Sequence, residues 1–308
     1  TSALAYVTSE DMPVFYTLEG QDELPLSTAF QNGLEKQNAQ LQSINLLTQE
    51  SVPEDAQGVL IMAPVTDISA DDADKLIAYL DKGGKVLMTT AYMEDFAEEM
   101  PNLQKVLDYF GLAIEKGLVI EGDSSMYYQQ PAYLLPDVAY DTLTKGISGE
   151  KYIFMPYAQG IRSEEKEDVT LTPLLTSSEA SYSKRNMNQA QNYAKEDGDA
   201  EGPFDVGIHA EKKLEEGTAG LTLFTSENLF TDNANSMVAD ANLTLFTNTV
   251  ASMSDSEVSV SVPVKSYEAS MITINDGTAF TLGALFMLLL PLGLLIAGIL
   301  VWIERRKR

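Results

Sequence analysis

A serine that directly follows a predicted strand is the first residue of this chain that could act as a nucleophile. The stretch EGDSS places Ser124 there. A serine nucleophile needs a histidine within hydrogen-bonding reach as its base, and the only histidine is His209, in the predicted strand FDVGIH. Alternation in that strand predicts that His209 is solvent-exposed beside Asp205 and Glu211. The chain contains no Gly-x-Ser-x-Gly motif. We therefore treat a surface hydrolase acting through Ser124 as the weakest of three functional hypotheses.

The chain lacks the residues that metal binding and thiol catalysis would need. The loop EDGDAEG resembles the start of a calcium site, with Asp197, Asp199 and Glu201 as ligands, but its twelfth position is Ile208, which has no carboxylate. The absence of cysteine excludes thiol nucleophiles and cysteine-based metal centres. It also removes the elbow nucleophile of an amidotransferase, and no phosphate-binding P-loop motif is present. We predict no catalytic residue, no metal and no cofactor.

The chain is strongly acidic, with 46 Asp and Glu against 20 Lys and Arg and a formal net charge of −26. Nucleic-acid binding needs a basic surface, so the composition argues against it. The same charge disfavours lying flat on anionic lipid.

An uncharged, apolar stretch near the end of the chain predicts a membrane-spanning helix. Residues from Gly277 to Ile303 include no Asp, Glu, Lys or Arg. As a helix, Phe280–Ile303 would measure roughly 36 Å, against a hydrocarbon core of ~30 Å. Pro291 lies within this stretch, and membrane helices accommodate proline through local distortion.

A basic tail follows the apolar stretch and predicts its orientation. Four of the last five residues are Lys or Arg, and basic residues next to a span favour the cytoplasmic side. We expect a cytoplasmic C-terminus and a large outer domain. Residues 1–30 contain no signal peptide and the chain begins with Thr1, so we expect that residues needed to start its export have been lost or cut away upstream.

Strands and helices alternate over the first 120 residues. The predicted strands are 13–18, 41–47, 58–64, 85–90 and 118–122, and the predicted helices are 26–37, 69–84 and 101–111. Such alternation predicts a doubly wound, mainly parallel α/β sheet of the amidotransferase-like or flavodoxin-like kind, with helices on both faces.

The rest of the chain divides into further segments. An irregular acidic segment at about 122–202 is expected to form exposed loops, followed by strands at 204–213 and 219–230, a helix at 236–253 and a strand at 258–264. The predicted domains are an extracytoplasmic α/β domain at 1–262, a juxtamembrane strand or linker at 263–278, a transmembrane helix at 279–303 and a basic cytoplasmic tail at 304–308.

Ligands of doubly wound sheets bind beyond the carboxyl ends of the strands. The polar residues that follow predicted strands there are the candidate binding residues: Gly20, Gln21, Glu23, Asp67, Thr90 and Ser226. The same residues are common in turns and helix caps, and for Asp67 a cap is the favoured interpretation.

The order of several blocks resembles one protein family. ALAYVTSEDMPVFYTLEGQDE, SVPEDAQGVLIMAPVTDISADDADKLIAYLDKGGKVLM, GPFDVGIHAEK and LFTSENLF, followed by the apolar span and basic tail, are similar to the GldG-like, gliding-motility-type auxiliary components of ABC transporters. The similarity covers nearly all 308 residues. One departure is Gly20-Gln21-Asp22-Glu23, where relatives often carry Gly-His-Gly-Glu.

The resemblance implies an outer α/β domain without catalytic apparatus, a separate ABC permease and cytoplasmic ATPase as partners, and a further outer region with a membrane helix before residue 1. The leading hypothesis is therefore a non-catalytic auxiliary subunit of a transporter at a bacterial cell surface, anchored in the lipid bilayer, whose outer domain engages a substrate, a wall component or another protein. The alternative is a membrane-tethered small-molecule receptor.

Overall fold

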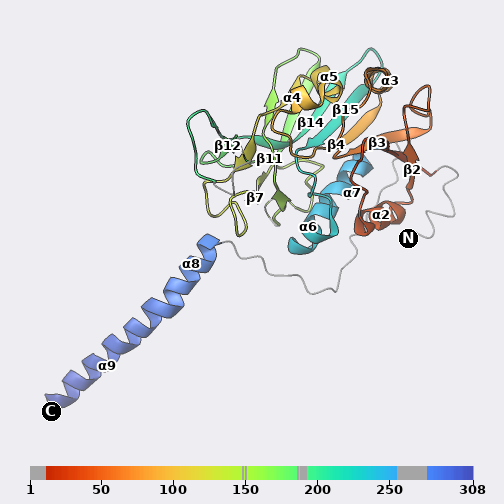
Figure 1. Ribbon diagram of the computed structural model, residues 1–308. Helices are drawn as coiled ribbons and strands as arrows, with labels where there is room; N and C mark the ends of the chain where they lie inside the picture. The colour runs from red at the N-terminus through yellow and green to blue at the C-terminus, as the bar shows by residue number, and fades with distance from the viewer. Residues whose placement is uncertain are drawn as a thin grey trace.

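A ten-stranded sheet forms the centre of the protein (Figure 1). The structure is a computed structural model that describes residues 12–147, 149, 151–185, 187, 193–254 and 276–307. The strands lie in the order β2-β1-β3-β4-β15-β14-β10-β5, with β11 paired to β14 and β8 to β11. Their bounds are β1 Val14–Leu18, β2 Gln40–Ile44, β3 Ala56–Met62, β4 Lys85–Thr89, β5 Leu112–Ile114, β8 Asp137–Val138, β10 Ile161–Ser163, β11 Val169–Thr176, β14 Asp205–Lys213 and β15 Thr218–Phe224.

The half of the sheet built mainly from the start of the chain is parallel, as predicted. Neighbouring strands in the order β2, β1, β3, β4 and β15 are parallel. The next pair, β15 with β14, is antiparallel. The pairings of β14 with β10 and β11, and of β10 with β5, are also antiparallel. The α/β class is confirmed, and the sheet is mixed.

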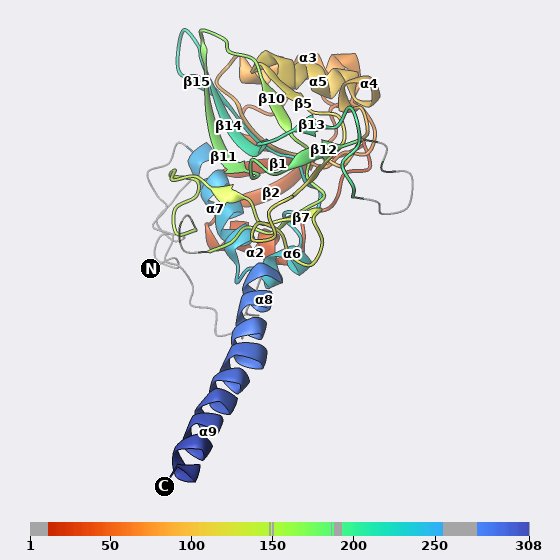
Figure 2. The ribbon, with the colours of Figure 1, turned by 90° about the vertical axis from the view of Figure 1, so that its left-hand side faces the viewer.

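Helices cover both faces of the sheet, and the strand sequences explain why. α3 (Ala70–Leu80), α4 (Phe96–Glu99) and α5 (Pro101–Tyr109) lie on one face, and α2 (Thr28–Lys36), α6 (Asp232–Met237) and α7 (Ala241–Met253) on the other (Figure 2). In β3, Val59 and Ile61 join one core, whereas Leu60 and Met62 join the other. A strand buried on both faces is a continuous apolar run, which is what the sequence contains.

The predicted caps hold the helices in place. The Ser69 side chain accepts a hydrogen bond from the Asp72 N–H at 3.1 Å and so caps α3. The chain leaves α3 through Gly83 at φ +87°, a left-handed conformation that favours glycine. Pro101 begins α5, where its missing N–H removes no helical hydrogen bond.

Two smaller sheets form beside the main one. The three-stranded sheet has the order β13 (Ala200–Glu201), β12 (Tyr182–Lys184) and β6 (Leu118–Ile120), and β7 (Tyr133–Leu134) pairs with β9 (Met155–Pro156). The predicted strand at 118–122 therefore belongs to this second sheet and not to the main one. The expectation of exposed loops at about 122–202 is wrong for much of the segment, because its described residues include β11 of the main sheet and bury side chains such as Phe154 and Leu175. Apart from β11, the strands between 122 and 202 have only two or three residues. Strands this short leave no readable period in a sequence.

The helix predicted at 236–253 is wrong in its first part. α6 ends at Met237, and α7 begins at Ala241. Ala239 and Asp240 separate them with φ values of +49° and +61°. A right-handed helix cannot pass through left-handed residues, so it breaks there. The predicted strand at 258–264 lies outside the described residues.

The C-terminal helix is long and apolar. α8 (Asp276–Ala284), the π-helical turn η1 (Leu285–Leu289) and α9 (Leu290–Arg306) run as one rod, drawn apart from the sheets in Figure 1. Its candidate span, Phe280–Arg306, has 27 residues, and an 18-residue window within it has a mean hydropathy of 2.8 and no buried part. The π-helical turn ends two residues before Pro291, which cannot donate a helical hydrogen bond, so the distortion lies near the proline, as the sequence predicts.

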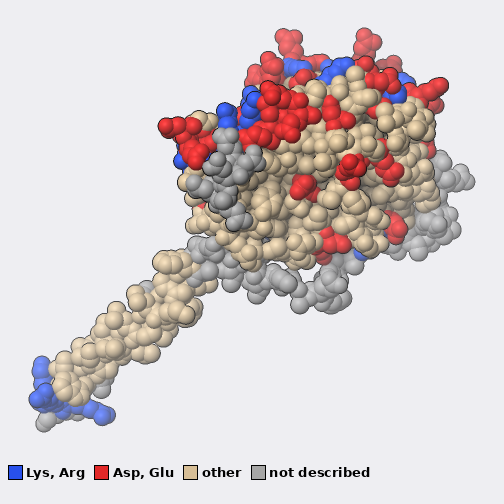
Figure 3. Space-filling view, viewed as in Figure 1, with Lys and Arg blue, Asp and Glu red and all other residues tan. Residues whose placement is uncertain are grey.

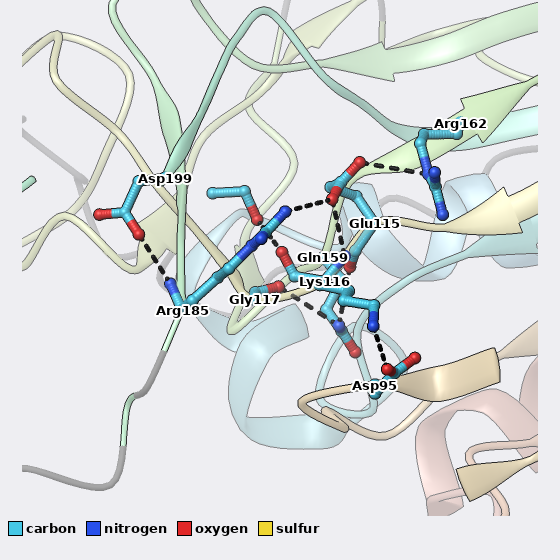
Figure 4. A network of polar contacts seen from close by, with 9 residues as sticks. Asp95, Glu115, Lys116, Gly117, Gln159, Arg162, Arg185 and Asp199 are labelled. Atoms are coloured by element: carbon cyan, nitrogen blue, oxygen red, sulfur yellow. Dashed lines mark hydrogen bonds and ion pairs between the residues drawn. The ribbon is translucent and has the colours of Figure 1, made fainter. Parts of the chain in front are cut away.

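The buried side-chain amide of Gln159 connects the main sheet to the three-stranded sheet (Figure 4). Gln159 has no exposed surface, and its Oε1 accepts the N–H of Met93, in the loop after β4, at 3.0 Å. Its Nε2 donates to the carbonyl oxygens of Met93, Glu115 and Gly117 at 2.8, 3.1 and 3.2 Å. The last two lie between β5 and β6, so this amide fixes the smaller sheet against the end of β4.

Around Gln159, ion pairs surround Glu115. Its carboxylate lies 3.2 Å from Arg162 Nε and 3.5 Å from an Arg185 guanidinium nitrogen, and Lys116 pairs with Asp95 (Figure 4). Both arginines are substantially exposed. Exposed pairs contribute little, so the buried amide carries most of the connection.

We predict that Gln159→Met lowers the free energy of unfolding by about 3 kcal/mol, because each buried polar group left without a partner costs about 1–3 kcal/mol. Denaturant unfolding of the detergent-solubilised protein measures this. Gln42→Met on β2 is the control: Gln42 is exposed, and such surface changes stay within about 0.5 kcal/mol. Equal effects of the two substitutions would contradict the assigned role.

Candidate functional site

The loops that follow β1, β3, β4 and β15 meet at the carboxyl edge of the parallel strands, as predicted. The Gln21 carbonyl oxygen accepts the N–H of Val65 at 3.0 Å, and the N–H of Ala63 donates to the Thr89 carbonyl oxygen at 3.0 Å. The N–H of Thr90 donates to the last residue of β15 at 3.2 Å. Four loops separated by up to about two hundred residues of sequence are thereby joined by backbone hydrogen bonds.

This edge concentrates buried polar atoms without hydrogen-bond partners in the described part of the chain: Gln21 Oε1, Glu23 Oε1, Thr89 Oγ1 and Thr90 Oγ1. The other carboxylate oxygen of Glu23 accepts the N–H groups of Gly20 and Gln21 at 3.1 and 3.0 Å. Gly20 permits this turn with φ +124°. Unpartnered buried groups are rare in native proteins and call for an explanation.

Two of the predicted binding residues at this edge are nevertheless buried, whereas Gly20 is exposed and Glu23 is partly exposed. Thr90 is 1% exposed and Gln21 is 6% exposed. Asp67, another predicted binding residue, caps α5. Its Oδ1 accepts the N–H of Leu103 at 3.0 Å, and its Oδ2 accepts the N–H and side-chain amide of Asn102 at 2.9 and 2.8 Å. The cap interpretation of Asp67 therefore fits, although the capped helix is α5.

Ser226 connects the edge to an open pocket. The residue is fully buried, and its hydroxyl donates to the Pro156 carbonyl oxygen at 2.5 Å. Pro156 and Asn228 both line a cavity of about 200 Å³, between the β7–β9 pair and the loop that leads from β15 into α6. Its lining residues are Tyr128, Gln129, Tyr133, Phe154, Pro156, Tyr157, Asn228, Thr231, Asn233, Ala234 and Met237.

The tyrosines of this aromatic pocket are linked to one another. The hydroxyl oxygens of Tyr133 and Tyr157 lie 3.3 Å apart, and Gln130 Nε2 donates to Tyr157 at 3.4 Å. The hydrogen bond to Tyr157, followed by burial, raises the pKa of Tyr133 above its usual value of 10.0. Its phenol is therefore neutral at physiological pH.

Two lining residues have unusual backbones. Gln129 has φ +62° and Tyr157 has φ +58°, in the left-handed region that residues other than glycine rarely adopt. Such conformations cluster at binding sites. The sequence analysis missed this pocket because its walls come from separate segments between 128 and 237. Only Ser226, one of the predicted binding residues, gave a signal near this pocket.

The predicted nucleophile and base are not brought together. Ser124 lies exposed in a turn after β6 of the second sheet, whereas His209 lies on β14 of the main sheet. His209 Nδ1 is 2.9 Å from Thr222 Oγ1, and its side chain is 22% exposed. The expectation of a solvent-exposed histidine is therefore wrong: most of the side chain is covered, and the ring contacts Thr222 of the neighbouring strand β15. Burial lowers the pKa of His209.

The acidic loop serves local structure. Asp199 accepts the N–H groups of Arg185 and Glu196 at 3.1 and 2.8 Å, and Glu201 pairs with Lys195 at 2.7 Å. Within the described residues, no group of three or more His, Asp or Glu side chains is arranged to hold a metal ion.

Comparisons with known proteins define the class. A mixed α/β sheet domain with one long apolar helix is what the structure shows, and the chain belongs to the family of auxiliary components of ABC-type transport systems. The model of that family, described as an ABC-type uncharacterized transport system, matches residues 13–281. This confirms the family resemblance seen in the sequence. No curated protein matches the chain.

Solved structures are similar to it in fold. The mmIFT52 N-terminal domain matches with a TM-score of 0.59 and 13% identity, covering 80% of this chain and 100% of that one. A glutamine amidotransferase from Thermotoga maritima matches with a TM-score of 0.45 and 10% identity, covering 80% and 100%. PurLQS from Thermotoga maritima matches with a TM-score of 0.41 and 9% identity, covering 79% and 100%. At these identities the likeness concerns the fold alone.

We predict that Thr90→Val leaves the free energy of unfolding unchanged or raises it by up to about 1 kcal/mol, because it removes a buried hydroxyl that has no partner. Thr225→Val is the matched control. The Thr225 hydroxyl donates to the Val206 carbonyl oxygen at 3.1 Å and to that of Gln159, so its loss should cost about 1–3 kcal/mol. A comparable loss in both variants would show that Thr90 has a hydrogen-bond partner in the native protein.

We predict that His209 makes the protein less stable in mild acid. Its folded-state pKa lies below the unfolded value of about 6.5, so the unfolded chain binds the proton first as pH falls. The free energy of unfolding of wild type, relative to that of His209→Gln, is then highest above about pH 6.5 and decreases as the pH is lowered further. Melting temperatures of both proteins in detergent, measured between about pH 8 and pH 5, test this. A constant difference between them would contradict it.

Proposed function

We propose that the protein is a non-catalytic, membrane-anchored auxiliary subunit of an ABC transporter, whose α/β domain engages a substrate or a partner protein outside the cell. The family match over residues 13–281 is the observation that carries the proposal. The apolar rod at Phe280–Arg306 supports anchoring in the bilayer. The partners would be a separate permease in the membrane and a cytoplasmic ATPase.

The charge distribution supports the orientation. The surface of the α/β domain in Figure 3 carries numerous Asp and Glu side chains, the rod has no charged residue from Gly277 to Ile303, and Lys and Arg gather at its end. Basic residues beside a span remain on the cytoplasmic side. This arrangement favours an outer α/β domain and an inner C-terminus.

A second candidate function is a membrane-tethered receptor, and the aromatic pocket favours it. Receptors need a concave site with aromatic walls and a few polar groups, and the pocket provides both. The two functions are compatible, because an auxiliary subunit that presents a ligand to a permease is also a receptor. A hydrolase is disfavoured, because Ser124 and His209 lie on different sheets.

We predict that the full chain, tagged and extracted in mild detergent from its own cells, retains a multi-span permease and an ATPase. Helices in membranes associate through close contacts at small residues, and Gly293 is such a residue within the rod. Gly293→Leu should therefore reduce the recovered permease several-fold. Quantitative mass spectrometry of the purified material measures the change.

The control for this experiment is Leu300→Met, which keeps the apolar volume and should leave recovery unchanged. Recovery of the chain alone, in every detergent tested, would contradict the transporter assignment. Equal recovery from wild type and Gly293→Leu would place the contact on other residues while leaving the assignment supported.

A further inference from the structure

One wall of the aromatic pocket is rigid. Tyr133 contacts Phe154 and Tyr157 edge-on, with ring centroids 5.6 and 5.3 Å apart, and Tyr128 contacts Phe154 in the same manner at 6.2 Å. Edge-to-face pairs hold aromatic rings in fixed relative positions. The rings therefore form an aromatic surface with little conformational freedom to lose on binding.

Three amide side chains among the lining residues have unused hydrogen-bonding capacity. Gln129 donates its Nε2 to the Tyr128 hydroxyl at 3.0 Å, which leaves its Oε1. Asn228 donates its Nδ2 to Glu227 at 3.2 Å, which leaves its Oδ1. Asn233 is exposed, and its side-chain amide makes no hydrogen bond with the described residues. The pocket can thus both donate and accept at its rim.

Charge excludes several ligand classes. None of the described residues that line the pocket is Asp, Glu, Lys or Arg. An anion would find no cation there and would face a chain of net charge −26. A quaternary ammonium suits aromatic walls, but it offers no partner to the amides. A purely aliphatic group would also leave them unpartnered, and desolvating them would oppose binding.

The volume of the cavity limits the size of the ligand. The cavity of about 200 Å³ is smaller than the ~300–1,000 Å³ of pockets that enclose drug-sized ligands. It is somewhat larger than a cavity of ~150 Å³ that holds benzene. It therefore accommodates one substituted ring, which can be the end or one unit of a longer molecule.

We infer that the pocket binds a neutral, hydroxyl-rich ring, such as one hexose unit of a glycan. The apolar face of such a ring packs on the tyrosines, and its hydroxyls donate to Gln129 Oε1 and Asn228 Oδ1 and accept from the Asn233 amide. This inference deepens the receptor role and rests on the proposed function only in placing the pocket outside the cell.

The test is isothermal titration of the full chain in a polyoxyethylene detergent, since a maltoside detergent would itself present hexose rings. The probes are maltotriose, cellotriose and chitotriose, with choline chloride and inorganic phosphate as charged comparisons. We expect at least one oligosaccharide to bind at millimolar concentration or below, and neither charged probe to bind.

Two variants test the location. Tyr128→Ala removes part of the aromatic wall, and Asn233→Ala removes a rim amide; each should weaken oligosaccharide binding by about tenfold, which corresponds to ~1.4 kcal/mol. Tyr152→Ala is the matched control, because Tyr152 is 51% exposed and does not line the pocket. Its affinity should match wild type. Circular dichroism and melting temperature confirm that each variant is folded.

Three outcomes would overturn the inference: binding of choline or phosphate in place of sugars, no binding of any oligosaccharide to the folded protein, or equal loss of affinity in Tyr152→Ala. None of these results alters the recovery of permease and ATPase with the full chain. Failure of the ligand class and failure of the transporter assignment are therefore distinguishable.

Discussion

Burial of the central parallel strands on both faces is the constraint on which the rest of this structure depends. Alternate side chains of β3 enter separate cores, and α2 with α7 on one face and α3 with α5 on the other cover them. Once both faces are covered, only the ends of these strands remain for ligands. Binding chemistry in such a sheet is thereby directed to the loops after β1, β3, β4 and β15.

Contacts with the two smaller sheets fix some of the loops at these strand ends. Gln159 fixes the β5–β6 turn against the loop after β4, and the Ser226 hydroxyl fixes the loop after β15 to β9. Gln21, Thr89 and Thr90 are buried at the ends of β1 and β4, and the cavity lies beside the loop after β15. The aromatic pocket is therefore a consequence of how the second layer packs on the first.

Several carboxylates near the strand ends hold the fold together through hydrogen bonds. Asp67 caps α5, and Asp232 accepts hydrogen bonds from Ser27 Oγ and the N–H of Ala29 at 2.8 and 3.1 Å, which fixes the start of α2. Buried Glu121 accepts the N–H groups of Asp123 and Ser178 at 2.9 and 3.0 Å. These three acids accept backbone N–H groups, and the described residues that line the aromatic pocket are uncharged.

The sequence by itself determined the α/β class, the main helices and parallel strands, the caps at Ser69 and Pro101, and the candidate membrane span. Each of these depends on residues that are neighbours in the chain, where apolar period, capping and length act locally. It also identified the loops that meet at the strand ends, because parallel strands place their carboxyl ends together. Only the tertiary structure decided that Thr90 is sealed, that His209 is covered and that Tyr128, Phe154 and Asn228 share one pocket. Those facts depend on contacts between distant segments, formed through two-residue strands and single buried side chains that leave no periodic pattern in a sequence.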